Sequence, residues 1–153
     1  MKLSESLKIN AKNIRIREFT MAGQKLRVRV PLASEMDEIN KKVESADWSH
    51  KRKEMIEPMF AKKEELASDK IVFEDDDVIF DGKSMKALAK ATAQTEIRIT
   101  EMIKLLVPIQ EGADMSTTTY EEINAEFPFS IQLELMKKII EVISPSYEET
   151  RKN

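Results

Sequence analysis

The stretch that decides the fold lies near the start of the chain, at residues 14–31, and reads IRIREFTMAGQKLRVRVP. Apolar residues alternate with arginine on both sides of the central AGQ, which is the period of a half-buried strand. Gly23 can adopt a positive φ at no steric cost, so Ala22-Gly23-Gln24 supplies a turn. Pro31 ends the second strand because it cannot donate to a ladder. The stretch therefore predicts a β-hairpin.

Most of the remaining chain has helical periodicity and capping residues. Ser34 and Ser84 are expected N-caps, Thr118 or Thr119 is expected to cap a short helix, and Pro58 is expected to kink or break another. A second short β element is expected where two apolar triplets flank an acidic run. The expected helices cover residues 34–46, 49–67, 84–107, 119–127 and 130–144, and the expected strands cover residues 71–73 and 78–80.

The pattern predicts an α+β fold, mainly helical, with an N-terminal β-hairpin and a second short β element. The chain has 153 residues, a length that suits one domain over residues 1–153. No linker or internal repeat divides it, and a polar tail begins at about residue 145.

Composition and charge exclude several classes of function. Lysine and arginine total 25 and aspartate and glutamate total 28, so the net charge is −3 and general attraction to nucleic acid is weak. The absence of cysteine excludes disulfides, thiolate nucleophiles and thiolate metal centres. The longest uncharged apolar stretch, residues 105–109, is far too short to cross a bilayer, and no apolar signal core follows Met1. These features predict a cytoplasmic protein without a membrane or nucleic-acid partner.

Few residues are suited to catalysis or metal binding. The one histidine, His50, lies in a charged stretch without a nucleophile motif. The three glycines are scattered and form no phosphate-binding loop. Residues 74–77 (EDDD) offer oxygen ligands for Mg²⁺ or Ca²⁺, but they lack the spacing and central glycine of a calcium loop, so we interpret them as a solvated turn. We expect no enzymatic activity, no cofactor and no metal.

Four arginines alternate with apolar residues in the hairpin and are therefore expected on one face: Arg15, Arg17, Arg27 and Arg29. Guanidinium groups this close repel one another unless anions neutralise them. Local carboxylates such as Glu18 and Glu35, the acidic surface of a protein, or nucleic acid could do so. One hypothesis is self-association, in which this face meets Asp75 and Asp76 in the acidic run of another copy.

Two helices are expected to offer apolar surface to a partner. Nine methionines are present, and methionine is flexible and polarizable, so an exposed methionine face adapts to many apolar partners. Met55 and Met59 lie one turn apart on a charged helix. Leu133 and Val142 lie off the apolar stripe of the closing helix. The candidate partner-binding residues are Met55, Ile56, Met59, Phe60, Leu133 and Val142.

Two segments carry a resemblance to a known family. The first is FTMAGQKLRVRVP at residues 19–31, followed by Ser34-Glu35. The second begins with FPFSI at residues 127–131, continues through the closing helix and ends with PSYEETRKN at residues 145–153. Together they resemble the opening hairpin, the acidic-capped helix, the C-terminal helix and the short tail of the tail assembly chaperones of long-tailed bacteriophages. The resemblance covers under half of the chain, and residues 46–83 do not share in it.

The resemblance implies a mixed, mainly helical fold without catalytic activity. It implies that the protein binds the long tape measure protein, whose exposed helices would otherwise aggregate, until tail tube protein subunits replace the chaperone. Members are often made in two lengths through a programmed ribosomal frameshift, and this chain would be the short form. The implied location is the host bacterial cytoplasm and not the mature virion.

Two other functions remain open to test. A structural phage tail component, such as a tube or tail-completion subunit, needs extensive β structure to build a ring, whereas the pattern predicts roughly three long helices and only short strands. A regulator that binds nucleic acid through the four hairpin arginines requires binding that weakens steeply with salt.

Overall fold

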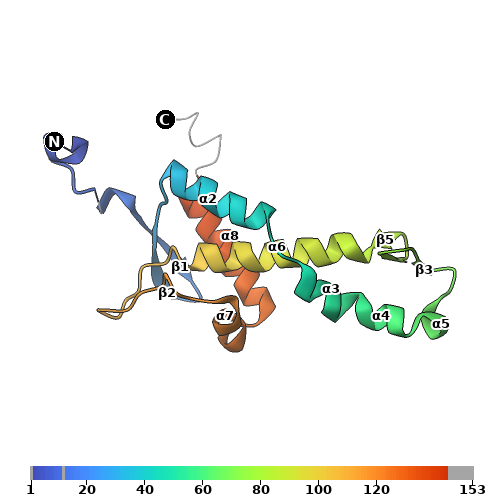
Figure 1. The fold of residues 1–153 in the computed structure, drawn as a ribbon. Coiled ribbons are helices and arrows are strands. Elements are labelled where there is room, and N and C mark those ends of the chain that lie inside the picture. Colours follow the sequence, from blue (N-terminus) through green and yellow to red (C-terminus); the bar gives the residue numbers. More distant parts are fainter. Residues whose placement is uncertain (1, 12, 145–153) are drawn as a thin grey trace. The chain divides into compact units, whose positions relative to one another are not determined.

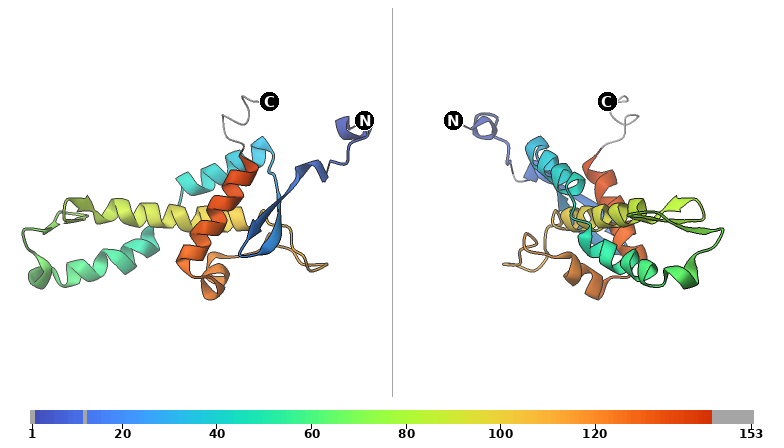
Figure 2. Two further views of the ribbon diagram at one scale, coloured as in Figure 1. Left: turned by 180° about the vertical axis from the view of Figure 1, so that it is seen from behind. Right: turned by 45° about the vertical axis from the view of Figure 1, so that its right-hand side comes forward.

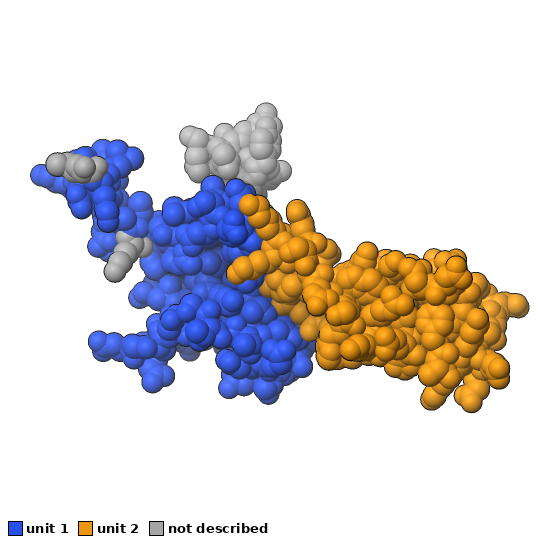
Figure 3. Space-filling model, viewed as in Figure 1, with its two compact units in different colours: residues 1–39, 98–153 blue, residues 40–97 orange. Residues whose placement is uncertain are grey.

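The computed structural model describes residues 2–11 and 13–144 of the chain. The chain divides into two compact units, which Figure 3 colours separately. Unit 1 comprises residues 1–39 and 98–153, and unit 2 comprises residues 40–97. The expectation of one domain over residues 1–153 stays a prediction, and the polar tail expected from about residue 145 lies outside the described residues.

Unit 1 contains the hairpin expected from the opening stretch (Figure 1). Strand β1 (Ile16–Met21) pairs antiparallel with β2 (Gln24–Arg29). Ala22 and Gly23 have φ values of 52° and 76°, as in a two-residue type I′ turn whose twist matches that of the strands. The predicted hairpin is therefore confirmed, and so is the α+β fold class, because helices and a second small sheet make up the rest.

The strand register separates the hairpin arginines, so the expectation that all four share one face is wrong. Residues directly opposite each other in an antiparallel pair lie on the same face. Arg17 lies opposite Val28, which is completely buried. Arg27 and Arg29 belong to the opposite face, since side chains alternate along a strand. Arg15 precedes the strand in a short 3₁₀ turn (Asn13–Arg15).

The physical cause is a change of phase inside β1. The residues of β1 that pack toward the core are Phe19 and Met21, which lie an odd number of positions from Ile16. Their side chains therefore lie on the face of the hairpin opposite to that of Ile16. Arg17 lies on the same face as Phe19 and Met21. Ile14 remains exposed. Alternation at the start of the stretch thus assigned the core to the wrong face of β1.

A short segment after the long helix extends the hairpin at the edge of β2. The Arg29 amide donates to the Leu105 carbonyl at 2.9 Å, and the Val107 amide donates to the Arg27 carbonyl at 2.9 Å. The long helix accordingly ends at Ile103 and not near residue 107 as expected. In a longer helix the Lys104 carbonyl would accept a hydrogen bond from the amide of residue 108, but Pro108 has no amide hydrogen.

Two C-terminal helices complete unit 1 and are joined by a tight turn (Figure 2). Thr119 caps α7 (Tyr120–Glu126) by accepting a hydrogen bond from the Glu122 amide at 3.3 Å, as predicted. Helix α8 (Phe129–Ile143) lies against β1 and β2. The buried core of unit 1 consists of Met21, Val28, Ile39, Ile99, Met102, Ile103, Leu105, Ile123, Leu135, Ile139 and Ile143.

Two helices span the boundaries between the units. Helix α2 (Ala33–Glu44) begins one residue before Ser34, so Ser34 lies inside its first turn and is not the expected N-cap. Glu35 instead accepts a hydrogen bond from the Leu32 amide at 3.1 Å, which is half of a capping box. Helix α6 (Met85–Ile103) is capped as predicted, with Ser84 Oγ accepting from the Ala87 amide at 3.0 Å.

Unit 2 packs three short helices and a small sheet beside the first part of α6 (Figure 1). The helix expected over residues 49–67 is broken at Ile56, because Pro58 cannot donate to the carbonyl four residues earlier. Ile56, Val78 and Ala89 form its buried core. Its elements are α3 (Ser49–Met55), α4 (Glu57–Ala61), α5 (Lys63–Leu66), β3 (Ile71–Phe73), β4 (Val78–Phe80) and β5 (Lys83–Ser84).

The acidic run at residues 74–77 is only partly a solvated turn. Asp77 is 7% exposed, and its carboxylate accepts hydrogen bonds from the Ser84 hydroxyl and from the Lys86 and Val78 amides. Burial raises its pKa, but these donors outweigh burial and hold the pKa below the ordinary value. Asp77 therefore ties the turn between β3 and β4 to the start of α6.

Candidate functional site

The methionine-bearing segment expected to meet a partner is part of the core of unit 2. Ile56 is completely buried, so its expected role in partner binding is wrong. Met55, Met59 and Phe60 are half-buried and pack against the Ile56 cluster. The Phe60 ring meets the Phe73 ring of β3 edge to face at 5.3 Å between centroids. The small sheet thus packs against the apolar face that was expected to bind a partner.

The two off-stripe residues of α8 are also used inside the protein. Leu133 and Val142 are half-buried and pack against the core of unit 1. The Val142 carbonyl accepts a hydrogen bond from the Arg17 guanidinium at 2.7 Å. Both residues therefore take part in the packing of unit 1, and Val142 lies where α8 meets the hairpin.

A local carboxylate neutralises two of the hairpin arginines, as one of the sequence interpretations proposed. Glu35 receives Arg15 Nη2 at 2.6 Å on Oε1 and Arg29 Nη1 at 2.8 Å on Oε2. The Arg29 guanidinium is the main reason that the pKa of Glu35 falls from 4.5 to about 2, with the Leu32 amide and Arg15 adding to the effect.

Residues expected in self-association are partly engaged within the chain. Lys86 Nζ lies 2.7 Å from an Asp76 carboxylate oxygen. Asp75 and Arg27 are exposed. Self-association through these residues stays a prediction, and its original basis, a face of four arginines, does not exist.

Replacing Glu35 with Gln is expected to destabilise unit 1 by about 1–2 kcal/mol, because both arginines lose their anion at a half-exposed position. A carboxylate with a depressed pKa stabilises the fold above its unfolded pKa, so this contribution is lost as pH falls from about 5 to about 2. Urea unfolding of wild type and E35Q across this range measures the difference. If the difference in free energy of unfolding between wild type and E35Q does not become smaller in acid, the expectation is contradicted.

The turn between α7 and α8 presents two phenylalanines to solvent. Phe127 and Phe129 are 39% and 50% exposed and flank Pro128. The Phe127 amide donates to the Ile123 carbonyl at 2.9 Å, and the Gln132 amide donates to the Pro128 carbonyl at 3.0 Å. The backbone on both sides of the two rings is therefore hydrogen-bonded. We call Phe127, Pro128 and Phe129 the aromatic turn.

A buried glutamine fixes the aromatic turn from inside. Gln132 is 0% exposed, and its amide nitrogen donates to the Phe127 carbonyl at 2.8 Å and to Asn124 Oδ1 at 3.0 Å. Its Oε1 accepts from the Tyr120 hydroxyl at 2.8 Å. These bonds join both helices to the turn and fix the backbone from which the two half-exposed phenylalanine side chains project.

Sequence reasoning singled out neither Gln132 nor the aromatic turn as a site. A signal was present, because a proline flanked by two phenylalanines places large apolar groups in a connection between two helical patterns, and connections run over the protein surface. Other large apolar side chains are exposed among the described residues: Leu3, Leu7, Ile9, Ile14, Leu32, Val72, Phe80, Leu88 and Ile109. The first two lie in or beside α1 (Leu3–Ser6), which has no buried residue.

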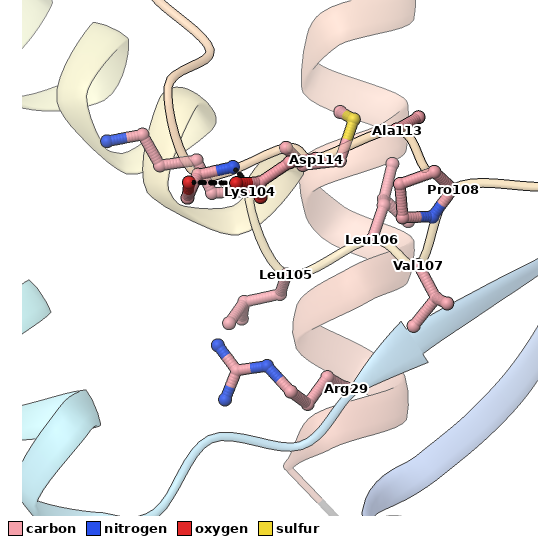
Figure 4. Close-up of a pocket in the computed structure, with 10 residues that line it drawn as sticks. Arg29, Lys104, Leu105, Leu106, Val107, Pro108, Ala113 and Asp114 are labelled. Carbon is pink, nitrogen blue, oxygen red and sulfur yellow. Dashed lines mark hydrogen bonds between the residues drawn. The ribbon is translucent and has the colours of Figure 1, made fainter. Parts of the chain in front are cut away.

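A shallow pocket of about 230 Å³ lies between the end of β2 and the loop after α6 (Figure 4). Its charged groups are already engaged: Arg29 binds Glu35, Lys104 lies 3.5 Å from Glu101, and the Asp114 carboxylate accepts from Ser116. We therefore assign no ligand to it.

Within residues 2–11 and 13–144, no group of three histidine, aspartate or glutamate side chains could hold a metal ion. None of the helices described is both long enough and apolar enough to span a bilayer. Comparison of the chain with protein-family models, with curated proteins and with solved structures gave no match.

Proposed function

We propose that this protein is a tail assembly chaperone of a long-tailed bacteriophage, which binds the tape measure protein, keeps it soluble and helps to recruit tail tube subunits. The observation that carries the proposal is the aromatic turn. Phe127 and Phe129 are exposed on a hydrogen-bonded turn, and they lie in one of the two segments that resemble this family. Exposed aromatic rings on a hydrogen-bonded turn suit a protein that covers apolar surface on a partner.

The proposed mechanism is reversible shielding of apolar helix faces on the tape measure protein. Burying two half-exposed phenylalanine rings provides a few kcal/mol at most, which is a weak contact for one copy. Several copies along one long client make the coat effective through multivalency. Weak individual contacts then allow polymerising tube subunits to displace the copies one at a time, in the cytoplasm of the host and before the virion is complete.

The short strands of the described chain favour a chaperone over a tube subunit. The longest strands, β1 and β2, have six residues each, and those of the second sheet have two or three. A ring built from neighbouring subunits requires extensive β structure, which these strands do not supply.

The double variant Phe127→Ser/Phe129→Ser is expected to weaken binding to the tape measure protein by about tenfold, because two exposed rings no longer transfer from water to the client. The measurement is co-expression with the neighbouring tape measure gene, followed by quantifying the soluble client and the chaperone that co-purifies with it. Thermal unfolding checks that the variant folds, with only a modest loss of stability expected because both side chains are half-exposed.

A matched control removes similar apolar area from unit 2 through Val72→Ser/Leu88→Ser, whose side chains are about as exposed as the two phenylalanines. The control is expected to retain wild-type binding. Equal losses in both double variants would show that the aromatic turn is not the binding surface. Failure of the wild-type protein to co-purify with the tape measure protein or to raise its solubility would refute the proposed function itself.

A further inference from the structure

Three cations surround the single tryptophan of the chain, all within unit 2. Trp48 immediately precedes α3 and is half-buried. The distances to its ring centroid are 5.3 Å from Lys90 Nζ, 5.9 Å from Lys86 Nζ and 6.0 Å from Arg52 Cζ. Each distance lies within the range of a cation–π interaction. We call Trp48, Arg52, Lys86 and Lys90 the tryptophan cluster.

The tryptophan cluster carries more positive charge than its neighbours neutralise. Lys86 has a carboxylate partner in Asp76, at 2.7 Å. Among the residues that the structure describes, neither Arg52 nor Lys90 has a carboxylate at ion-pair distance. Lys86 and Lys90 are also four positions apart on α6, a spacing at which like charges repel. Three cations and one paired carboxylate leave a net charge of +2 at the cluster, which favours binding of a further anionic group.

One cation of the cluster already pairs with a carboxylate of the chain. Asp76 already places a carboxylate at the edge of the cluster, where Lys86 and, to a smaller extent, Arg52 lower its pKa. The exposed Asp75 and Glu74 beside it repel a continuous polyanion such as a nucleic-acid backbone. A short acidic peptide needs to bring only a few carboxylates to Arg52 and Lys90, so it meets less of this repulsion than a long polyanion does.

We propose that Trp48, Arg52 and Lys90 form a binding site for an acidic peptide segment of a partner protein. Carboxylates of the segment pair with the Arg52 guanidinium and the Lys90 ammonium. The indole ring of Trp48 packs beside the side chains of Arg52 and Lys90. The inference goes beyond the proposed chaperone function. It concerns a charged surface of unit 2, whereas the client is expected to meet the aromatic turn of unit 1, so either one can fail without the other.

The test uses intrinsic fluorescence, because the one tryptophan makes emission specific to this site. Titrating the full chain with hexaglutamate at low ionic strength is expected to give a saturable change in emission. The variant Arg52→Gln/Lys90→Gln is expected to bind about tenfold more weakly, since two charge-assisted contacts are lost. The control variant Lys53→Gln/Lys62→Gln makes the same charge change at two exposed lysines and is expected to keep wild-type affinity.

Three outcomes would overturn the proposal. Unchanged emission at millimolar hexaglutamate would show that the cluster binds no acidic peptide. Equal weakening in the two double variants would show only general charge attraction. Tighter binding of single-stranded oligothymidylate than of hexaglutamate would assign the cluster to nucleic acid instead. If the double variant does not fold, the single variants R52Q and K90Q replace it, each with about threefold weaker binding expected.

Discussion

Replacing Asp77 with Ala is expected to destabilise unit 2 by about 3–4 kcal/mol, one of the two largest effects that the structure predicts for a single residue. The Asp77 carboxylate accepts from the Ser84 hydroxyl at 2.5 Å, the Val78 amide at 2.7 Å and the Lys86 amide at 2.8 Å. Alanine leaves the buried Val78 amide and the first turn of α6 without this acceptor. Hydrogen bonds to a charged group are stronger than neutral ones, so the loss is larger than for an ordinary cap.

Urea unfolding followed by Trp48 emission measures the Asp77 effect, because that tryptophan lies in the same unit. Asp75→Ala is the matched control, since Asp75 is exposed in the same acidic run, and a change below about 0.5 kcal/mol is expected there. The lowered pKa of Asp77 means that its contribution is present above the ordinary value of 3.8 and is lost as pH falls through the folded value. Wild type and D77A should therefore converge in acid, and equal stability at neutral pH would exclude the role.

Replacing Gln132 with Ala is expected to cost unit 1 about 3–4 kcal/mol. The Phe127 carbonyl and Asn124 Oδ1 each lose a donor, the Tyr120 hydroxyl loses its bond to Gln132, and a cavity opens beneath the aromatic turn. Gln132→Leu keeps most of the volume but supplies none of the hydrogen bonds, so it is expected to recover only about 1 kcal/mol of the loss.

Amide hydrogen exchange is the most direct measurement for Gln132, because it reports on the Phe127 and Gln132 amides at the turn itself. Faster exchange there, with little change in unit 2, is the expected pattern. Gln110→Ala is the control, since Gln110 is exposed in a loop of the same unit and is expected to change stability by less than about 0.5 kcal/mol. If Q132L is as stable as wild type, volume and not hydrogen bonding fixes the turn.

Sequence reasoning succeeded where the deciding interaction lies within a few residues of the chain. A turn at Ala22-Gly23-Gln24, a Ser84 cap and a cap at Thr118 or Thr119 were predicted. The structure confirms the Ser84 cap, places the turn at Ala22 and Gly23 with Gln24 in β2, and assigns the other cap to Thr119. Each depends on a local backbone conformation or on a hydrogen bond spanning three residues. Such features are encoded by side-chain type and spacing alone.

The candidate surfaces were less predictable, because exposure depends on segments far apart in sequence. Ile56 was expected to face a partner, but the second sheet covers it. Gln132 was not identified, because a glutamine in a helix gives no sign that three partners will converge on it. The aromatic turn was visible as residues, yet only the arrangement of α7 and α8 showed that its rings stay exposed.

The amino-acid sequence alone therefore determined the element types, the hairpin turn, most caps and the α+β class, since these follow from backbone sterics and short-range hydrogen bonds. Only the tertiary structure decided which face of β1 is buried, which arginines share Glu35 and where large apolar groups remain exposed. Those outcomes depend on burial, and burial is a property of the packed segments together and not of any one of them.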